Sequence, residues 1–530
     1  MKVLISDKLS EAGLAIFKAA KGITVDYQPG LGKEIDKLKL AIADADAIAI
    51  RSGTTLKADI IDCAKQLKVI GRAGIGVDNV DVPAATKKGI IVMNTPGGNT
   101  VTTAEHAISM MCALTRQIPQ ATSSIKAGKW EKSRFMGSEM YQKTLGVIGC
   151  GNIGKIVADR ALGLKMKVIA FDPFLSDEIA EKIGVKKVEL DDLFKNADFI
   201  TLHVPKNEKT ANLLNKEAFA KMKKGVYIIN CARGGIVDEK ALADAIEAKI
   251  VAGAALDVFD KEPVDPANPL LKLDQVICTP HLGAATEEAQ ENVALEVAHQ
   301  IVDFLTTGTI QNAVNFPSVS GETVAALKPY LSLAEKIGKL QGQLAGESPT
   351  DISVEYCGEL TKLPIAPLTV VVLRGILEPI LEDVSVNMVN APVIAKERGI
   401  RVTESKITDH ADFSSLITVT LGFKSGKKTI AGTIFGKTHP RIVKMDDYYL
   451  EVVPEGRILI IHNEDKPGVV GNVGTLLAKN NINISRLQLG ISKSTKMAAA
   501  FYNVEGSVGP QVLVDLKKLP GIVSVQQVVL

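Results

Sequence analysis

The stretch Thr144-Leu145-Gly146-Val147-Ile148-Gly149-Cys150-Gly151-Asn152-Ile153-Gly154 places a GxGxxG pattern between an apolar run and an amphipathic one. In such a strand–turn–helix, the glycines allow a tight turn and close approach of the backbone to a pyrophosphate, which sits at the helix N-terminus. The next apolar run ends in Asp172, 172 − 154 = 18 residues past the last glycine, where a carboxylate can accept the ribose hydroxyls. Because an acidic residue there repels a 2′-phosphate, the sequence predicts a site for NAD rather than NADP.

Short β-branched runs alternate with longer amphipathic runs on both sides of this motif, from residue 1 to about 315. This alternation is typical of parallel, doubly wound α/β sheets. The strands are too many for one sheet, and the helix-like run Thr286–Leu305 follows the last of them. We therefore expect two sheets, with a Rossmann domain inserted in the first domain and a cleft between them. The expected strands are Val3–Ser6, Ala47–Arg51, Val69–Arg72, Ile90–Asn94, Thr144–Gly149, Lys167–Asp172, Phe199–Val204, Val226–Cys231, Ala254–Val258 and Gln275–Thr279.

The pattern changes after residue 315. The last 75 residues follow the order strand, helix, strand, strand, helix, strand, which is the ferredoxin-like βαββαβ motif. The region before them contains isolated turns and no recognisable catalytic spacing, and we expect an α+β domain there. The expected domains are residues 1–98 with 284–315, residues 99–283, residues 316–455 and residues 456–530.

Composition excludes several classes of protein. The chain has 530 residues, 46% of them apolar, and its net charge of 62 − 60 = +2 gives no reason to expect nucleic acid or membrane as a partner. No apolar run approaches the roughly 18 residues of a membrane span. The six cysteines are scattered without a CxxC pair or zinc spacing, so we expect reduced thiols, no metal site and a cytoplasmic location.

Three side chains follow expected strands, where loops overhang the cleft of an open α/β sheet. Arg233 could hold a carboxylate in its bidentate fork, and His281 could exchange the proton of an alcohol while the cofactor takes the hydride. A carboxylate such as Glu262 would stabilise a protonated histidine. On this argument His203 could serve equally well, so spacing alone leaves the choice open.

In this order, the GxGxxG motif, Asn230–Gly235, Asp257–Pro263 and Pro280–Gly283 resemble the D-isomer-specific 2-hydroxyacid dehydrogenase family. The resemblance assigns substrate orientation to Arg233, acid/base chemistry to His281 and the partner role to Glu262. It moves His203 to a position beside the cofactor. Ile75 stands where some relatives carry a threonine beside the nicotinamide. The implied NAD contacts are Ile75, Gly149, Gly151, Asn152, Ile153, Gly154, Asp172, Val204, Cys231, Ala232, Arg233, Asp257, His281, Leu282, Gly283 and Ala284.

Further stretches resemble long-form members of the family that oxidise 3-phospho-D-glycerate to 3-phosphooxypyruvate at the start of L-serine synthesis. They include Arg51–Thr54, Gly71–Asn79 and Val92–Pro96. A triply anionic substrate needs a cationic cleft, which these stretches and the basic run Lys129–Arg134 could supply. That run can reach the neighbouring subunit's active site in family members, although it could also be a solvated loop. The implied substrate contacts are Arg51, Ser52, Arg72, Gly74, Gly76 and Arg134.

The C-terminal motif Ile461–Val470, followed by Asn481–Ile484, resembles an ACT regulatory domain, and residues 316–455 resemble the intervening domain of the long-form enzymes. The resemblance implies a homodimer or homotetramer with L-serine bound between two ACT domains, in contact with Asn463, Asp465 and Asn483. The alternative is a domain that only mediates assembly.

Two other functions stay open. One is an NAD-dependent dehydrogenase of the same family acting on hydroxypyruvate, glyoxylate or 2-oxoglutarate. The other is a non-catalytic, NAD-sensing protein like the corepressors that share this fold.

Overall fold

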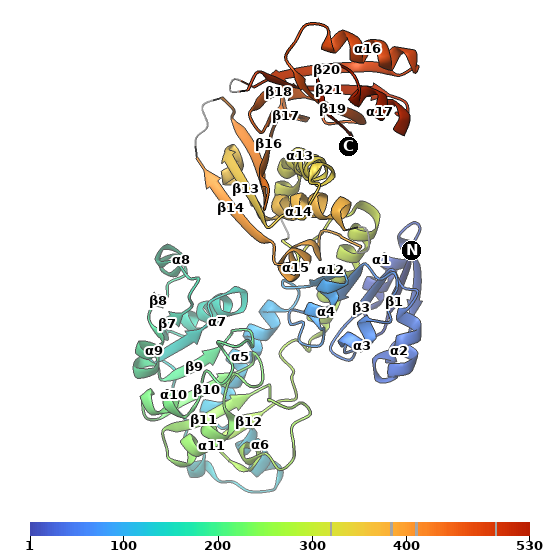
Figure 1. Cartoon of the computed structure of the whole chain (residues 1–530). Coiled ribbons are helices and arrows are strands. Elements are labelled where there is room, and N and C mark those ends of the chain that lie inside the picture. The colour runs from blue at the N-terminus through green and yellow to red at the C-terminus, as the bar shows by residue number, and fades with distance from the viewer. Residues whose placement is uncertain (318–320, 382–384, 409–411, 493–494) are drawn as a thin grey trace.

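The computed structural model describes residues 1–317, 321–381, 385–408, 412–492 and 495–530. Within these ranges the strands form four sheets. The first two sheets lie in two lobes side by side, and the other two form a body above them in Figure 1. The expected α/β class is confirmed, as is the ferredoxin-like C-terminal unit.

The first lobe contains a five-stranded parallel sheet with the order β2-β1-β3-β4-β5. Helices cover both faces, which explains why its inner strands are apolar apart from one charged end residue in β1 and in β4. α1 and α12 pack on one face and α2, α3 and α4 on the other, so the long helix α12 does return to the first unit. The bounds are β1 Lys2–Ile5, β2 Thr24–Tyr27, β3 Ala47–Ile50, β4 Val69–Arg72, β5 Ile91–Asn94, α1 Glu11–Ala19, α2 Ile35–Ile42, α3 Ala58–Ile61, α4 Val82–Lys87 and α12 Glu287–Thr307.

The second lobe contains a seven-stranded parallel sheet with the order β12-β11-β10-β9-β6-β7-β8. The strand order reverses between β6 and β9, and ligands of such sheets bind at the carboxyl ends of these strands. α5 and α7 cover one face, and α9, α10 and α11 cover the other. The bounds are β6 Thr144–Ile148, β7 Lys167–Phe171, β8 Lys186–Lys187, β9 Phe199–Leu202, β10 Val226–Asn230, β11 Val251–Leu256, β12 Val276–Cys278, α5 Thr100–Thr115, α6 Ile118–Lys126, α7 Asn152–Gly163, α8 Asp177–Lys182, α9 Leu190–Asn196, α10 Lys216–Lys221 and α11 Glu239–Glu247.

Two edge strands, β2 and β8, were not expected from the sequence. β2 has no fully buried residue, and β8 consists of two exposed lysines. Neither strand carries the apolar run that marks a buried parallel strand, because each lies at a sheet edge.

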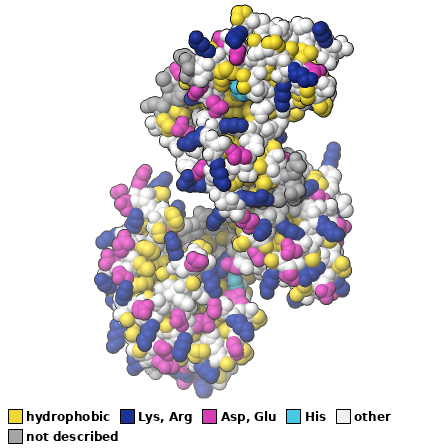
Figure 2. Space-filling view, in the orientation of Figure 1, with side chains coloured by type: hydrophobic (Ala, Val, Ile, Leu, Met, Phe, Trp, Pro, Cys, Tyr) yellow, Lys and Arg dark blue, Asp and Glu magenta, His cyan; other side chains and the backbone are white. Residues whose placement is uncertain are grey.

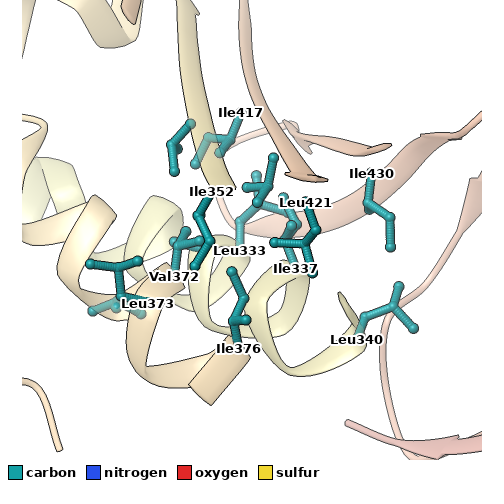
Figure 3. Close-up of a cluster of buried hydrophobic side chains, with 14 of the residues drawn as sticks. Leu333, Ile337, Leu340, Ile352, Val372, Leu373, Ile376, Ile417, Leu421 and Ile430 are labelled. Atoms are coloured by element: carbon teal, nitrogen blue, oxygen red, sulfur yellow. The ribbon is translucent and has the colours of Figure 1, made fainter. Parts of the chain in front are cut away.

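The upper body begins with a mixed six-stranded sheet in the order β14-β13-β15-β16-β17-β18. β13 and β14 run parallel, and the other neighbours run antiparallel. α13 and α14 pack together against this sheet, and Figure 3 shows Leu333, Ile337, Val372 and Ile376 of these helices facing Ile352 and Leu421 of the strands. The bounds are α13 Gly321–Leu344, β13 Asp351–Gly358, α14 Ala366–Ile380, α15 Ala391–Glu397, β14 Arg401–Ile407, β15 Ser415–Phe423, β16 Gly426–Phe435, β17 His439–Met445 and β18 Tyr448–Val452.

The C-terminal unit is an antiparallel sheet in the order β20-β21-β19-β22 with two helices on one face. Alternate residues of β19 point to opposite faces. Leu459 and Ile461 pack under the helices, whereas Ile458 and Ile460 join the core of the mixed sheet. The two upper units therefore share one apolar core. The bounds are β19 Arg457–Glu464, α16 Val469–Lys479, β20 Asn483–Ile491, β21 Met497–Glu505, α17 Pro510–Lys517 and β22 Ile522–Val529.

The upper body also docks on the first lobe. Val389, just before α15, belongs to the same apolar cluster as the first lobe's sheet. The Asn387 amide donates to the Gly89 carbonyl at 2.9 Å, and Lys87 of α4 pairs with Glu397 of α15 at 3.1 Å. The lobe that carries part of the cleft is thus attached to the upper body by apolar and polar contacts.

Candidate active site

The two lobes face each other across a cleft, and Figure 2 shows the surface hollowed between them. A cavity of about 530 Å³ lies where loops after β4 and β5 meet loops after β6, β9, β10 and β11. A second cavity of about 320 Å³ adjoins it and shares Arg72, Asn99, His281 and Ala284. Predicted site residues that line the first cavity are Arg72, Ile75, Gly76, Asn152, Ile153, Val204, Cys231, Ala232, Arg233, Asp257, His281, Gly283 and Ala284. Those that line the second are Arg51, Ser52, Arg72, Gly74, Glu262, His281 and Ala284.

The glycine motif joins β6 to α7 as expected. Gly149 has φ +89°, a conformation that favours glycine, and a Cβ there would lie 2.5 Å from the His203 carbonyl oxygen. Gly151 faces open space and precedes α7, whose N-terminus has no capping side chain among the described residues. Its backbone N–H groups are therefore available to a pyrophosphate. At the end of β7, Asp172 accepts the backbone N–H groups of Cys150 and Phe174, both at 2.8 Å. These residues fit NAD.

His281 and Glu262 meet in space, which sequence could not establish. The distance from His281 Nδ1 to Glu262 Oε2 is 2.7 Å. Glu262 Oε1 also accepts the Phe259 N–H at 3.1 Å, which fixes the carboxylate. The His281 side chain is half exposed. Because Nδ1 faces the carboxylate, Nε2 is the ring nitrogen that remains for a substrate.

Asp257 anchors the loop that carries His281. Its side chain is 1% exposed and accepts the Thr279 hydroxyl at 2.6 Å and the Leu282 and Gly283 N–H groups at 2.7 and 2.8 Å. Burial acts to raise the pKa of Asp257, but contacts with His106, Thr279 and Leu282 outweigh it and lower the pKa. The loop backbone is unusual, since His281 has φ +56°. Asp257 thus holds a strained turn in place through an anionic, buried acceptor.

His203, the alternative acid/base candidate, lies in a different environment. It is partly buried and lines the larger cavity beside the glycine motif, and its burial lowers its pKa to about 4. Its Nε2 lies 2.9 Å from the Thr201 hydroxyl, and its Nδ1 has no hydrogen-bond partner in the described part of the chain. Because His203 is a neutral, partly buried imidazole with no carboxylate partner among the described residues, His281 is favoured for proton transfer.

Arginines from both lobes converge on the cleft. Arg233 donates from Nε to Asp78 Oδ2 at 2.8 Å. Burial, with the nearby charges of Arg233 and Arg51, lowers the pKa of Arg72 to about 10, although Asp78 opposes this. Arg72 Nε is buried without a hydrogen-bond partner among the described residues. Such a concentration of positive charge suits a multiply charged anion.

Asn99, which the sequence analysis did not identify, also belongs to the site. It is 8% exposed, lines both cavities, and its Oδ1 has no hydrogen-bond partner within the described ranges. It follows Gly97 and Gly98, where the chain crosses between the lobes. The only available sequence signal was its position after a strand and before a helix.

Four predicted residues lie away from the cleft of this chain. The Arg134 guanidinium contacts Glu131 at 3.3 Å and Asp274 at 3.6 Å and lines neither cavity described above. In the ACT sheet, Asn463 pairs with Ala498 of β21, whereas Asn483 pairs with Glu505. These positions are 505 − 498 = 7 residues apart along β21, or roughly 23 Å. Asn463 and neighbouring Asp465 therefore lie at the opposite end of the sheet from Asn483.

The described residues contain no group of three or more His, Cys, Asp or Glu side chains placed to hold a metal ion. In the same part of the chain, no helix combines the length and apolarity needed to span a bilayer.

Comparison with known proteins shows where the chain has relatives. Residues 108–283 match the family model for the NAD-binding domain of D-isomer-specific 2-hydroxyacid dehydrogenases. Residues 326–446 match the D-3-phosphoglycerate dehydrogenase intervening domain, and residues 457–521 match the ACT domain.

Individual relatives match over most of the chain. The D-3-phosphoglycerate dehydrogenase of Archaeoglobus fulgidus is 45% identical over 525 residues, 99% of both chains. That of Bacillus subtilis is 40% identical over 526 residues, again 99% of both. Among solved structures, D-lactate dehydrogenase from Aquifex aeolicus, complexed with NAD and lactic acid, superposes with a TM-score of 0.52. It is 28% identical and covers 60% of this chain and 100% of its own.

Proposed function

Because the chain belongs to the D-3-phosphoglycerate dehydrogenases of the D-isomer-specific 2-hydroxyacid dehydrogenase family, we propose that its interlobe cleft is where 3-phospho-D-glycerate is oxidised to 3-phosphooxypyruvate. The protein is an NAD-dependent oxidoreductase of the serine pathway with an attached regulatory domain. The observation that carries the assignment to this cleft is the 2.7 Å contact between His281 and Glu262. Arg233 and the first residues of α7, in the glycine motif, line the same cavity as His281.

Proton transfer is the part of the reaction that this chain performs directly. His281 Nε2 accepts the proton of the substrate C2 hydroxyl, and the imidazolium that results is stabilised by Glu262 at Nδ1. Asp257 keeps the histidine in place by holding its loop. NAD, when bound, supplies the hydride acceptor for C2. Without either the histidine or its carboxylate partner, the proton released by the substrate would have no stabilised acceptor.

Substrate binding follows from the charges of the cleft. Arg233 orients the substrate carboxylate, and the buried charge of Arg72, with Arg51 beside it, balances the phosphate. Ser52, Gly74 and the other residues that line the smaller cavity surround the phosphate end of the substrate. The cofactor is held by the glycine motif, by Asp172 at the ribose and by the remaining implied contacts of the larger cavity.

The assignment is tested by NADH formation at 340 nm with NAD and 3-phospho-D-glycerate, with the ketoacid product trapped to draw the reaction forward. We expect turnover that drops at least a hundredfold in kcat/KM when unphosphorylated D-glycerate replaces the substrate. Equal kcat/KM for the two acids would refute a phosphate-specific site. A lack of turnover in both directions would refute the assignment altogether.

We further propose that L-serine is an effector that binds between ACT domains of two copies. The ACT match supports a regulatory ligand. The separation of Asn463 and Asp465 from Asn483 within one chain supports a site shared by two copies, since a single small ligand cannot contact both ends of the sheet. Serine should therefore inhibit the oligomer, and Asn483→Ala should remove the inhibition while keeping kcat. Inhibition that persists in that variant would contradict the site.

A homodimer or homotetramer is proposed from apolar side chains exposed on the second lobe. Trp130 is 85% exposed, Met136 78% and Tyr141 63%, and all three lie in the segment between α6 and β6 that also contains Arg134. Large apolar side chains clustered on a surface mark a protein interface. Burial of this segment against a second copy would also give Arg134 a route to that copy's cleft. Sedimentation of the wild type and of Trp130→Ala tests the interface.

We retain the expected domain division at residues 98/99, 283/284, 315/316 and 455/456 as a proposal. The cytoplasm remains the proposed location, supported by the free thiols of Cys63, Cys112, Cys150, Cys231 and Cys278.

A further inference from the structure

An ion pair joins the two walls of the cleft. Asp78 lies in the loop after β4 of the first lobe, and Arg233 lies in the loop after β10 of the second, 155 residues further along the chain. Arg233 Nε donates to Asp78 Oδ2 at 2.8 Å, and both residues line the larger cavity. The arginine assigned to the substrate carboxylate is thus held by a carboxylate from the opposite wall.

Two acceptors determine how the Arg233 guanidinium lies. Besides the contact of Nε with Asp78, Nη1 donates to the Ala232 carbonyl at 2.6 Å. Because the group is planar, these two bonds fix its orientation. A Cβ at Gly76 would overlap Arg233 Nη2 and lie 2.7 Å from Asp78 Oδ2, so glycine leaves the space for this pair. The Nη1–Nη2 end of the fork remains able to bind a carboxylate with two hydrogen bonds.

The charge of Asp78 should affect substrate binding in the opposite direction from its alignment of Arg233. Its charge supports the protonated form of Arg72, which Arg233 and Arg51 oppose. It also reduces the positive potential that attracts an anionic substrate. If charge alone mattered, removal of Asp78 would strengthen substrate binding, whereas loss of alignment would weaken it. The two effects can be separated by substitutions that remove the same charge.

We propose that Asp78 is a positioning residue of the dehydrogenase, which aligns the Arg233 fork from the opposite wall so that its Nη1–Nη2 end receives the substrate carboxylate. The inference rests on the proposed function, because it takes the 2-hydroxyacid carboxylate as the ligand of Arg233. It adds to that function a residue whose effect appears in substrate binding rather than in proton transfer.

The test compares Asp78→Asn with Asp78→Ala in the full-length protein. Both lose the charge, but only asparagine keeps an oxygen that can accept the Arg233 Nε–H. We expect KM for 3-phospho-D-glycerate to be about tenfold higher in the alanine variant than in the asparagine variant. We expect kcat to differ less than threefold and the Kd for NADH, measured by fluorescence, to stay the same. Asp78 is largely exposed, so both variants should fold.

The outcomes distinguish this inference from the proposed function. Equal KM values in the two variants, or a lower KM in the alanine variant, would overturn the positioning role. A wild type without turnover on 3-phospho-D-glycerate would instead overturn the function. As a second variant, Gly76→Ala should raise KM when it is introduced into the wild type. It should change KM little when it is introduced into Asp78→Ala, because the two substitutions act on the same guanidinium. If the two substitutions raised KM independently, so that their factors multiplied in the double variant, the proposal would also be overturned.

Discussion

Removal of the Asp257 carboxylate should release the loop that carries His281. In Asp257→Ala, the Leu282 and Gly283 N–H groups lose an anionic acceptor at 2.7 and 2.8 Å. A hydrogen bond to a charged group contributes roughly 1.5–3 kcal/mol. Since 1.36 kcal/mol is a factor of ten, each amide should exchange with solvent about ten- to a hundredfold faster. We expect kcat to fall at least as far, because the histidine loses its position.

Hydrogen–deuterium exchange of the peptide spanning these amides measures the effect directly. Amides of β7, which lies toward the opposite edge of the sheet, serve as an internal control, and their exchange rates should not change. A matched variant, Thr279→Val, removes only the hydroxyl that donates at 2.6 Å and should accelerate exchange much less. Unchanged protection of the loop in Asp257→Ala, combined with lost activity, would refute the anchoring role and indicate another role for the carboxylate.

The same anchor has a defined pH dependence. The pKa of Asp257 is lowered in the folded protein relative to 3.8, the ordinary value for aspartate. Its stabilising contribution is therefore complete above the unfolded-state pKa and disappears as the pH falls through the lower, folded-state pKa. Loop protection should persist from neutral pH down to about pH 4 in the wild type. A loss of protection between pH 7 and pH 5 would contradict this assignment.

Three further outcomes are expected. Since the pKa of Arg72 is about 10, KM for the anionic substrate should rise as the pH increases through 10. Arg72→Gln should raise KM about tenfold or more at pH 8 and should abolish the rise in KM near pH 10. A wild-type KM that does not change with pH would exclude a role of the Arg72 charge in substrate binding. Asp172→Ala should raise the Kd for NAD about tenfold in a fluorescence titration, because the ribose loses its acceptor. The preference for NAD over NADP should also fall. An unchanged Kd for NAD would contradict the ribose contact. His281→Ala should reduce kcat by at least a thousandfold while the Kd for NADH stays nearly constant; simultaneous loss of both would mean that the residue acts in cofactor binding.

The sequence was most informative where structure and chemistry depend on neighbouring residues. The GxGxxG turn, the buried strands around it and the strand–helix order of the C-terminal unit are local patterns, and the structure confirms all three. Edge strands β2 and β8 were not predicted, because a strand at the edge of a sheet does not need an apolar run. The strands of the mixed sheet were not predicted for a different reason. β13 does alternate buried and partly exposed residues, but its partners β14 and β15 lie far along the chain, so the sheet depends on contacts between distant segments.

The sequence by itself determined which residue types stand at the ends of the strands, and hence the candidates Arg233, Glu262 and His281. Only the tertiary structure gives a reason to prefer His281 to His203 as the proton acceptor, because burial and a carboxylate partner depend on contacts between distant segments. The pairing of Asp78 with Arg233 likewise exists only because the two lobes face each other. Local sequence specifies backbone geometry and apolar periodicity, whereas desolvation and charge pairing are properties of the folded surface as a whole.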